Sequence, residues 1–189
     1  MQTSHATFDD DDLSTVVLIG ARGSGKSTVG RLLAEALELE FIDLDDRALA
    51  LCDEPSVRAV FERRGELAWR VAEAAALTEA FKSKRVVIAT GGGAACIDPP
   101  LRVLRDAAAA GMLAIVWLRC DGQTMQDRLA KDVGDRPSLT RGDPVDEAIE
   151  IAVSRASAYE AVATHTVDAA VLPEQVVERI QASLFRSSS

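Results

Sequence analysis

A glycine-rich stretch directly after an apolar run constrains this chain more than any other feature. The stretch GARGSGKST spans Gly20 to Thr28 and follows an apolar run at 16–19. It fits the pattern G-x-x-x-x-G-K-[ST], in which glycines let the backbone curl so that successive N–H groups point at phosphate oxygens. The β-branched run predicts a buried strand, and apolar residues at helical spacing over 26–37 predict a helix. The sequence therefore predicts a strand, a phosphate loop (residues 20–28) and a helix that together bind a nucleoside triphosphate.

Length and composition predict one globular domain. The chain has 189 residues, of which 48% are hydrophobic and 27% are charged. Its formal charge of -9 argues against nucleic acid as a partner, because contacts to a phosphate backbone need a basic face. The longest uncharged run, 107–118, is too short to cross a bilayer, no secretory signal is visible, and the three scattered cysteines suit a reducing compartment. We therefore expect a cytoplasmic monomer without membrane contact, made of an acidic mobile leader (1–13), one domain (14–186) and a tail (187–189).

The rest of the chain alternates between predicted strands and helices. Strands are predicted at 41–45, 86–89, 114–118 and 165–168, and helices at 67–81, from Pro144 to about 156, and from Pro173 onward. In the helix at 67–81, the residues expected on the inward face are Leu67, Val71, Ala74, Thr78 and Phe81. The charged stretch 131–143 has no periodicity and predicts a lid or a disordered loop. Strands separated by helices indicate a parallel sheet with helices on both faces.

Three features distinguish among the classes of nucleotide-binding protein. The chain has no asparagine, whereas a GTPase switch reads guanine with an Asn-Lys-x-Asp element. The apolar strand at 86–89 runs into Thr90 and three glycines, not into the acid that a motor ATPase places there. Asp43 and Asp45 instead follow the loop helix, and alternation along a strand would place both side chains on the same side. One carboxylate can then serve Mg²⁺ while the other faces an acceptor hydroxyl, which favours a kinase for a small alcohol.

Two arginines and a triple glycine indicate an anionic acceptor. Arg70 and Arg155 are far apart in the sequence, and two guanidinium groups that converge on one pocket would pair well with a carboxylate. Each arginine alone is also compatible with a surface or ion-paired role. The segment Gly91-Gly92-Gly93 follows a predicted strand, so it offers backbone N–H groups and room for close approach. The alternative for this segment is a flexible turn.

Taken together, these motifs resemble those of the shikimate kinase family. The resemblance extends from about 16 to about 180, with GARGSGKST, FIDLD, FERRGELAWR, ATGGGA, DRPSL and RASAY in the family's order. It implies an α/β fold of the three-layer P-loop kinase type, with a five-stranded parallel sheet in the order 2-3-1-4-5 and helices on both faces. It also implies acceptor-binding helices at about 46–82 and a lid at about 131–143. The implied reaction is ATP- and Mg²⁺-dependent phosphorylation of the 3-hydroxyl of shikimate, in aromatic amino-acid biosynthesis.

The resemblance also implies roles for individual residues. Those implied in nucleotide binding are Gly23, Ser24, Gly25, Lys26, Ser27, Thr28, Arg128, Arg136 and Pro173. Those implied in shikimate binding are Asp45, Phe61, Trp69, Arg70, Gly91, Gly92, Gly93 and Arg155. The implied Mg²⁺ residues are Ser27 and Asp43, and the implied catalytic residues are Lys26, Asp45 and the lid residue Arg136. Phe61 and Trp69 fit ordinary core packing nearly as well.

The sequence departs from the family pattern in three places. The segment RASAY lacks the usual proline and bulky residue and has Ser157 and Ala158 instead, Glu54 stands where a glycine is usual, and Ser138 replaces a lid leucine. These changes leave the residues that carry the chemistry in place, and they bear on the acceptor more than on phosphoryl transfer. Two alternatives therefore stay open. One is a kinase for another small hydroxylated acid, such as a gluconate-type kinase, and the other is a catalytically silent nucleotide-binding regulator.

Overall fold

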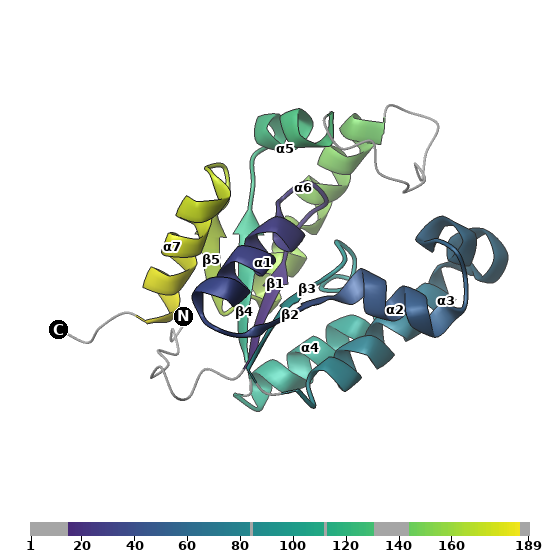
Figure 1. Cartoon of the computed structure of the whole chain (residues 1–189). Coiled ribbons are helices and arrows are strands. Elements are labelled where there is room, and N and C mark those ends of the chain that lie inside the picture. Colours follow the sequence, from purple (N-terminus) through teal and green to yellow (C-terminus); the bar gives the residue numbers. More distant parts are fainter. Residues whose placement is uncertain (1–14, 84, 112, 131–143, 186–189) are drawn as a thin grey trace.

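A single parallel β-sheet organises the protein. The computed structural model describes residues 15–83, 85–111, 113–130 and 144–185. Within them, five strands pair in the order β2-β3-β1-β4-β5, which confirms the expected fold (Figure 1). The strands are β1 (Thr15–Ile19), β2 (Glu40–Asp43), β3 (Val86–Ala89), β4 (Ala114–Arg119) and β5 (His165–Asp168). The helices are α1 (Lys26–Ala36), α2 (Leu44–Cys52), α3 (Val57–Ala80), α4 (Pro100–Ala109), α5 (Gly122–Leu129), α6 (Pro144–Val162) and α7 (Pro173–Leu184).

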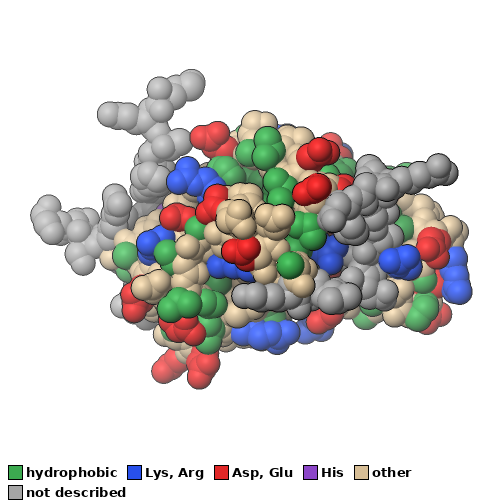
Figure 2. Space-filling view, turned by 90° about the horizontal axis from the view of Figure 1, so that it is seen from above, with side chains coloured by type: hydrophobic (Ala, Val, Ile, Leu, Met, Phe, Trp, Pro, Cys, Tyr) green, Lys and Arg blue, Asp and Glu red, His purple; other side chains and the backbone are tan. Residues whose placement is uncertain are grey.

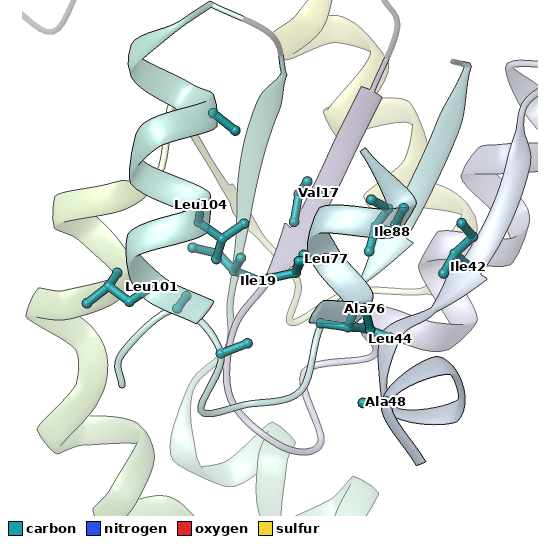
Figure 3. Close-up of a cluster of buried hydrophobic side chains, with 14 of the residues drawn as sticks. Val17, Ile19, Ile42, Leu44, Ala48, Ala76, Leu77, Ile88, Leu101 and Leu104 are labelled. Atoms are coloured by element: carbon teal, nitrogen blue, oxygen red, sulfur yellow. The ribbon is translucent and has the colours of Figure 1, made fainter. Parts of the chain in front are cut away.

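Helices cover both faces of the sheet, as expected. Val16 and Leu18 of β1 belong to a core cluster with residues of α1 and α7. Val17 and Ile19, which point the other way, belong to a second cluster with residues of α3, α4 and α6. Figure 3 shows part of this second cluster, with Leu77 and Leu104 beside the strands. Burial on both faces explains why β1 reads as a continuous apolar run and not as an alternating one.

The acidic segment after α1 is a strand only as far as Asp43, so the expected strand through Asp45 is wrong. The side chain of Asp43 caps α2, because its Oδ1 accepts a hydrogen bond of 3.1 Å from the backbone N–H of Asp45. A carboxylate that bonds the backbone two residues further on turns the chain out of extended conformation and starts a helix. Asp45 therefore lies in the first turn of α2, two residues beyond Asp43, which remains at the end of the strand.

The acceptor-side helix α3 begins ten residues earlier than expected and buries a different face. Ser56 caps it by accepting a 3.1 Å hydrogen bond from Ala59 N–H, and Gly65 interrupts it at φ 80° and ψ 168°. Leu67 is 71% exposed and Val71 is 54% exposed, so the expected inward face is wrong. The buried residues after the interruption are Trp69, Arg70, Ala72, Glu73, Ala76, Leu77 and Ala80. In an alanine-rich helix, apolar residues occur on every side, so their pattern does not identify the buried face. The buried face also contains the charged residues Arg70 and Glu73, which apolar periodicity does not predict.

Other expectations agree with the structure or lie outside it. The strands β3 and β5 have the expected bounds, and α7 buries Val176, Val177, Ile180 and Leu184 as expected. The leader 1–13, the stretch 131–143 with Arg136, and the tail 187–189 lie outside the described residues. None of the helices that the structure describes is both long and apolar enough to cross a membrane. On the face shown in Figure 2, acidic and basic side chains are intermingled.

Two leucines on α3 test the observed packing. We expect Leu77→Ala to lower the free energy of unfolding by roughly 2–5 kcal/mol, because Leu77 is fully buried and its loss leaves a cavity. The matched control Leu67→Ala, on the same helix but exposed, should change it by less than about 0.5 kcal/mol. Urea unfolding followed by circular dichroism measures both. Equal effects would contradict the observed orientation of α3.

Candidate active site

The phosphate loop joins β1 to α1 in the geometry that its glycines allow. Gly23 has φ 79° and Gly25 has φ 93°, which is the left-handed region that residues with a Cβ rarely adopt. A side chain on Gly23 would also meet Leu129 at 3.0 Å. Gly25 is the N-cap of α1, so the open N–H groups at the start of this helix face the loop's concave side. Loop and helix end together form an anion-binding site.

Lys26 lies over its own loop. The side chain is 8% exposed, and Nζ donates hydrogen bonds to the backbone oxygens of Gly20 at 2.9 Å and Ala21 at 2.8 Å. These carbonyls hold the ammonium group at the mouth of the loop, where the terminal phosphates of a bound nucleotide would lie. A cation fixed at this place supplies charge to phosphate oxygens without further reorganisation.

Ser27 and Asp43 bring two hard oxygen donors together beside the loop. The hydroxyl of Ser27 donates to Asp43 Oδ2 at 2.7 Å. One residue comes from the first turn of α1 and the other from the end of β2. Mg²⁺ prefers a small number of such oxygen ligands and shares the rest of its coordination with water and substrate phosphates. The pair therefore fits Mg²⁺ at the edge of the phosphate loop.

A wide cleft of about 910 Å³ runs along the loop. It is lined by most of the residues expected to bind nucleotide, namely Gly23, Gly25, Lys26, Ser27, Thr28, Arg128 and Pro173. Ser24 is buried beneath the loop. Arg128 connects the cleft's two walls, because its guanidinium donates to the backbone oxygens of Ser24 at 3.2 Å, Ala169 at 2.8 Å and Val171 at 3.1 Å. The volume suits a nucleotide-sized ligand.

A smaller cavity of about 140 Å³ adjoins this cleft. All eight residues expected to bind the acceptor line it: Asp45, Phe61, Trp69, Arg70, Gly91, Gly92, Gly93 and Arg155. The cavity and the cleft share five lining residues, namely Arg22, Asp45, Val57, Gly91 and Gly92. Phe61 and Trp69 also pack on each other, with ring centroids 6.5 Å apart. Core packing and cavity lining are thus not exclusive for these two rings.

Arg70 is held between two carboxylates, and one of them, Glu73, is a cavity residue that the sequence analysis did not predict. Arg70 Nη1 donates to Glu73 Oε2 at 2.7 Å, and Nη2 donates to Glu66 Oε1 at 2.7 Å. Burial acts to lower the pKa of Arg70, but the charges and hydrogen bonds of Glu73 and Glu66 outweigh it and raise that pKa. Burial also raises the pKa of Glu73, against the opposing effect of Arg70. The spacing of three between Arg70 and Glu73 on a helix was the available sequence signal.

The triple glycine lets the backbone approach these charged groups closely. A Cβ on Gly91 would lie 2.6 Å from Asp45 Oδ1 and 2.6 Å from Glu73 Oε1. A Cβ on Gly93 would overlap the guanidinium of Arg70. No side chain fits at either place without moving a charged group, so the segment is a shaped wall of the cavity and not only a flexible turn.

The chain as a whole matches a known family. A family model described as shikimate kinase matches residues 22–185. The chain belongs to the shikimate kinase family. A relative named shikimate kinase 2, from Yersinia enterocolitica, is 38% identical over 168 residues, which are 88% of this chain and 92% of that protein. Membership makes this chain a kinase that transfers a phosphoryl group from ATP to a hydroxyl of shikimate.

Solved structures agree with this assignment. The structure described as shikimate kinase from Acinetobacter baumannii in complex with shikimate is 29% identical, with a TM-score of 0.79, and the match covers 94% of this chain and 96% of that one. A shikimate kinase from Aquifex aeolicus is 31% identical with a TM-score of 0.72, covering 90% of this chain and 95% of that one. A gluconokinase from Sinorhizobium meliloti, at 22% identity and a TM-score of 0.58, shares the fold alone.

Two neighbouring glycines give a sharp test of the cavity wall. We expect Gly91→Ala to lower kcat about 100-fold, because its Cβ displaces the Asp45 carboxylate and a misplaced group of this kind costs about that factor. Gly92→Ala should lose much less, since its Cβ would meet nothing closer than 3.5 Å. Steady-state kinetics with thermal melts of both variants measures this. A smaller loss in Gly91→Ala than in Gly92→Ala would contradict the wall's geometry.

Proposed function

We propose that the protein transfers the γ-phosphoryl group of ATP, in the presence of Mg²⁺, to the 3-hydroxyl of shikimate. The single observation that carries the proposal is the place of Asp45. This carboxylate lines both the nucleotide cleft and the acceptor cavity. A hydroxyl bound in the cavity would therefore face the end of the phosphate loop with a carboxylate beside it.

The nucleotide side is assigned to the phosphate loop. Its backbone N–H groups and Lys26 bind the terminal phosphates, and Ser27 and Asp43 are the residues that would hold Mg²⁺. The ion, when bound, neutralises charge on the phosphate oxygens. Arg128 and Pro173, at the far end of the cleft, contact the base. These assignments rest on the family resemblance together with the positions of the residues in one cleft.

The acceptor side is assigned to two arginines and the glycine wall. Arg70 and Arg155 bind the carboxylate of the acceptor, and the backbone of the triple glycine contacts its ring hydroxyls. Asp45 accepts the hydrogen bond of the attacking hydroxyl and takes its proton as the oxygen bonds to the γ-phosphorus. The bond from that phosphorus to the bridging oxygen breaks, ADP leaves, and the proton passes to solvent. Action as a monomer in the cytoplasm stays a prediction.

A panel of acceptors tests the proposal directly. We expect ADP release to depend on shikimate and to be at least about 100-fold slower with gluconate, quinate or no acceptor, because a transition state built around one bound acid discriminates against others. A coupled assay of ADP release measures this. Preference for gluconate would establish the gluconate-type alternative, and nucleotide binding without turnover on any acceptor would establish the silent regulator.

The role of Asp45 is separable from that of the metal site. We expect Asp45→Asn to lower kcat by about 100-fold or more while the KM for ATP changes less than about two-fold, because the amide keeps the shape but accepts no proton. The matched variant Asp43→Asn should instead raise the Mg²⁺ concentration needed for half-maximal rate. If Asp45→Asn also raised that concentration, Asp45 would belong to the metal site.

A further inference from the structure

Tyr159 makes a buried hydrogen bond to the cavity wall that the proposed chemistry does not use. This residue of α6 is 2% exposed, and its hydroxyl donates to the backbone oxygen of Gly92 at 2.6 Å. Its ring packs on Trp117 of β4, with centroids 5.9 Å apart. Burial raises the pKa of the Tyr159 phenol well above its usual value. The hydroxyl therefore keeps its proton and remains a donor over the whole working range of pH.

The same backbone oxygen is also contacted by one of the acceptor arginines. Arg155, one turn before Tyr159 on α6, donates from Nη1 to Gly92 O at 3.3 Å. A carbonyl oxygen has two lone pairs and can accept both bonds. The hydrogen bond from Tyr159 is much shorter than the one from Arg155, so the phenol is the main hydrogen-bond donor to this buried oxygen. The guanidinium of Arg155 makes the longer of the two bonds to the wall and also interacts with the Tyr159 hydroxyl.

The other two carbonyls of the triple glycine are bonded within the turn itself. Gly91 O accepts from Ala94 N–H at 3.2 Å, and Gly93 O accepts from Cys96 N–H at 3.0 Å. Gly92 O is the one that is bonded by side chains from another helix. In a planar trans peptide, the C=O of one residue and the N–H of the next point in opposite directions. A Gly92 carbonyl that is held in place therefore also holds the Gly93 N–H in place. Tyr159 thus sets the orientation of the peptide that packs against Arg70.

We propose that Tyr159 is a positioning residue for the acceptor, and the proposal rests on the proposed function. Its hydroxyl holds the Gly92–Gly93 peptide in the orientation that presents the wall to the acceptor. By satisfying Gly92 O, it also keeps Arg155 available for the acceptor's carboxylate. Without the hydroxyl, Arg155 becomes the side chain that satisfies the buried carbonyl and is drawn away from the acceptor.

The variant Tyr159→Phe removes the hydroxyl and keeps the ring. We expect the KM for shikimate to rise roughly 5- to 20-fold, as the loss of one buried hydrogen bond predicts, while the KM for ATP stays within about two-fold and kcat within about three-fold. The matched control is Trp117→Phe, which disturbs the packing of the same ring but keeps the hydroxyl. It should lower the melting temperature and leave the KM for shikimate within about two-fold. A variant that only loosened the fold would raise both KM values together.

The chain's single tyrosine allows a second test in the unsubstituted sequence. Biosynthetic replacement by 3-fluorotyrosine gives one ¹⁹F resonance, which shikimate should shift in a saturable way and ADP alone should not. This measurement tests the role of Tyr159 even if Tyr159→Phe does not fold. An unchanged KM for shikimate in Tyr159→Phe, or a ¹⁹F resonance indifferent to shikimate, would overturn it. Absence of shikimate-dependent turnover in the unsubstituted protein would instead overturn the proposed function.

Discussion

The pairing of β3 between β1 and β2 is the constraint on which the site depends. In the parallel register, Ala89 at the end of β3 lies opposite both Leu18 of β1 and Asp43 of β2. The phosphate loop, the triple glycine and the cap of α2 therefore all begin at the same level of one sheet edge. Thr90 reinforces this level, since its N–H and its hydroxyl both bond Leu18 O, at 3.1 Å and 3.0 Å. A shift in this strand register would separate the nucleotide cleft from the acceptor cavity.

A buried ion pair lines the proposed acceptor cavity. A guanidinium removed from water is costly unless carboxylates surround it, and Arg70 meets this condition through Glu73, which is fully buried, and Glu66, which is half exposed. The ion pair is therefore poor evidence for stability, and with Glu66 it fixes the position of the Arg70 guanidinium before any ligand binds. Because Gly93 packs against the guanidinium, the arginine has little freedom to leave.

The strands could be predicted from the residues, and the strand order and eight of the cavity's lining residues from the family resemblance, but the contacts that hold the lining could not. Strands such as β1 and β3 are short and apolar and lead into glycine-rich segments, so they are easily predicted from the sequence. Asp45 lines the cavity, but not through alternation along a strand, since the cap formed by Asp43 places Asp45 in a helix. The inward face of α3 was mistaken because alanines carry little directional information. Glu73 was missed because a buried carboxylate can be predicted only when its partner, here Arg70, is already known to be buried.

Of the departures from the family pattern, those within the described residues do not line the acceptor cavity, and Ser138 lies outside those residues. Residues four apart on a helix share a face, so Arg155 and Tyr159 both line the cavity, whereas Ser157 is exposed and neither it nor Ala158 is among the lining residues. Glu54 pairs with Arg63 at 2.8 Å before α3 and does not line the cavity either. In the part of the chain that the structure describes, the altered positions thus leave the cavity's chemistry unchanged. They lie on the side of α6 that does not line the cavity and just before α3. Any effect on the acceptor must therefore act through a change in the position of these helices.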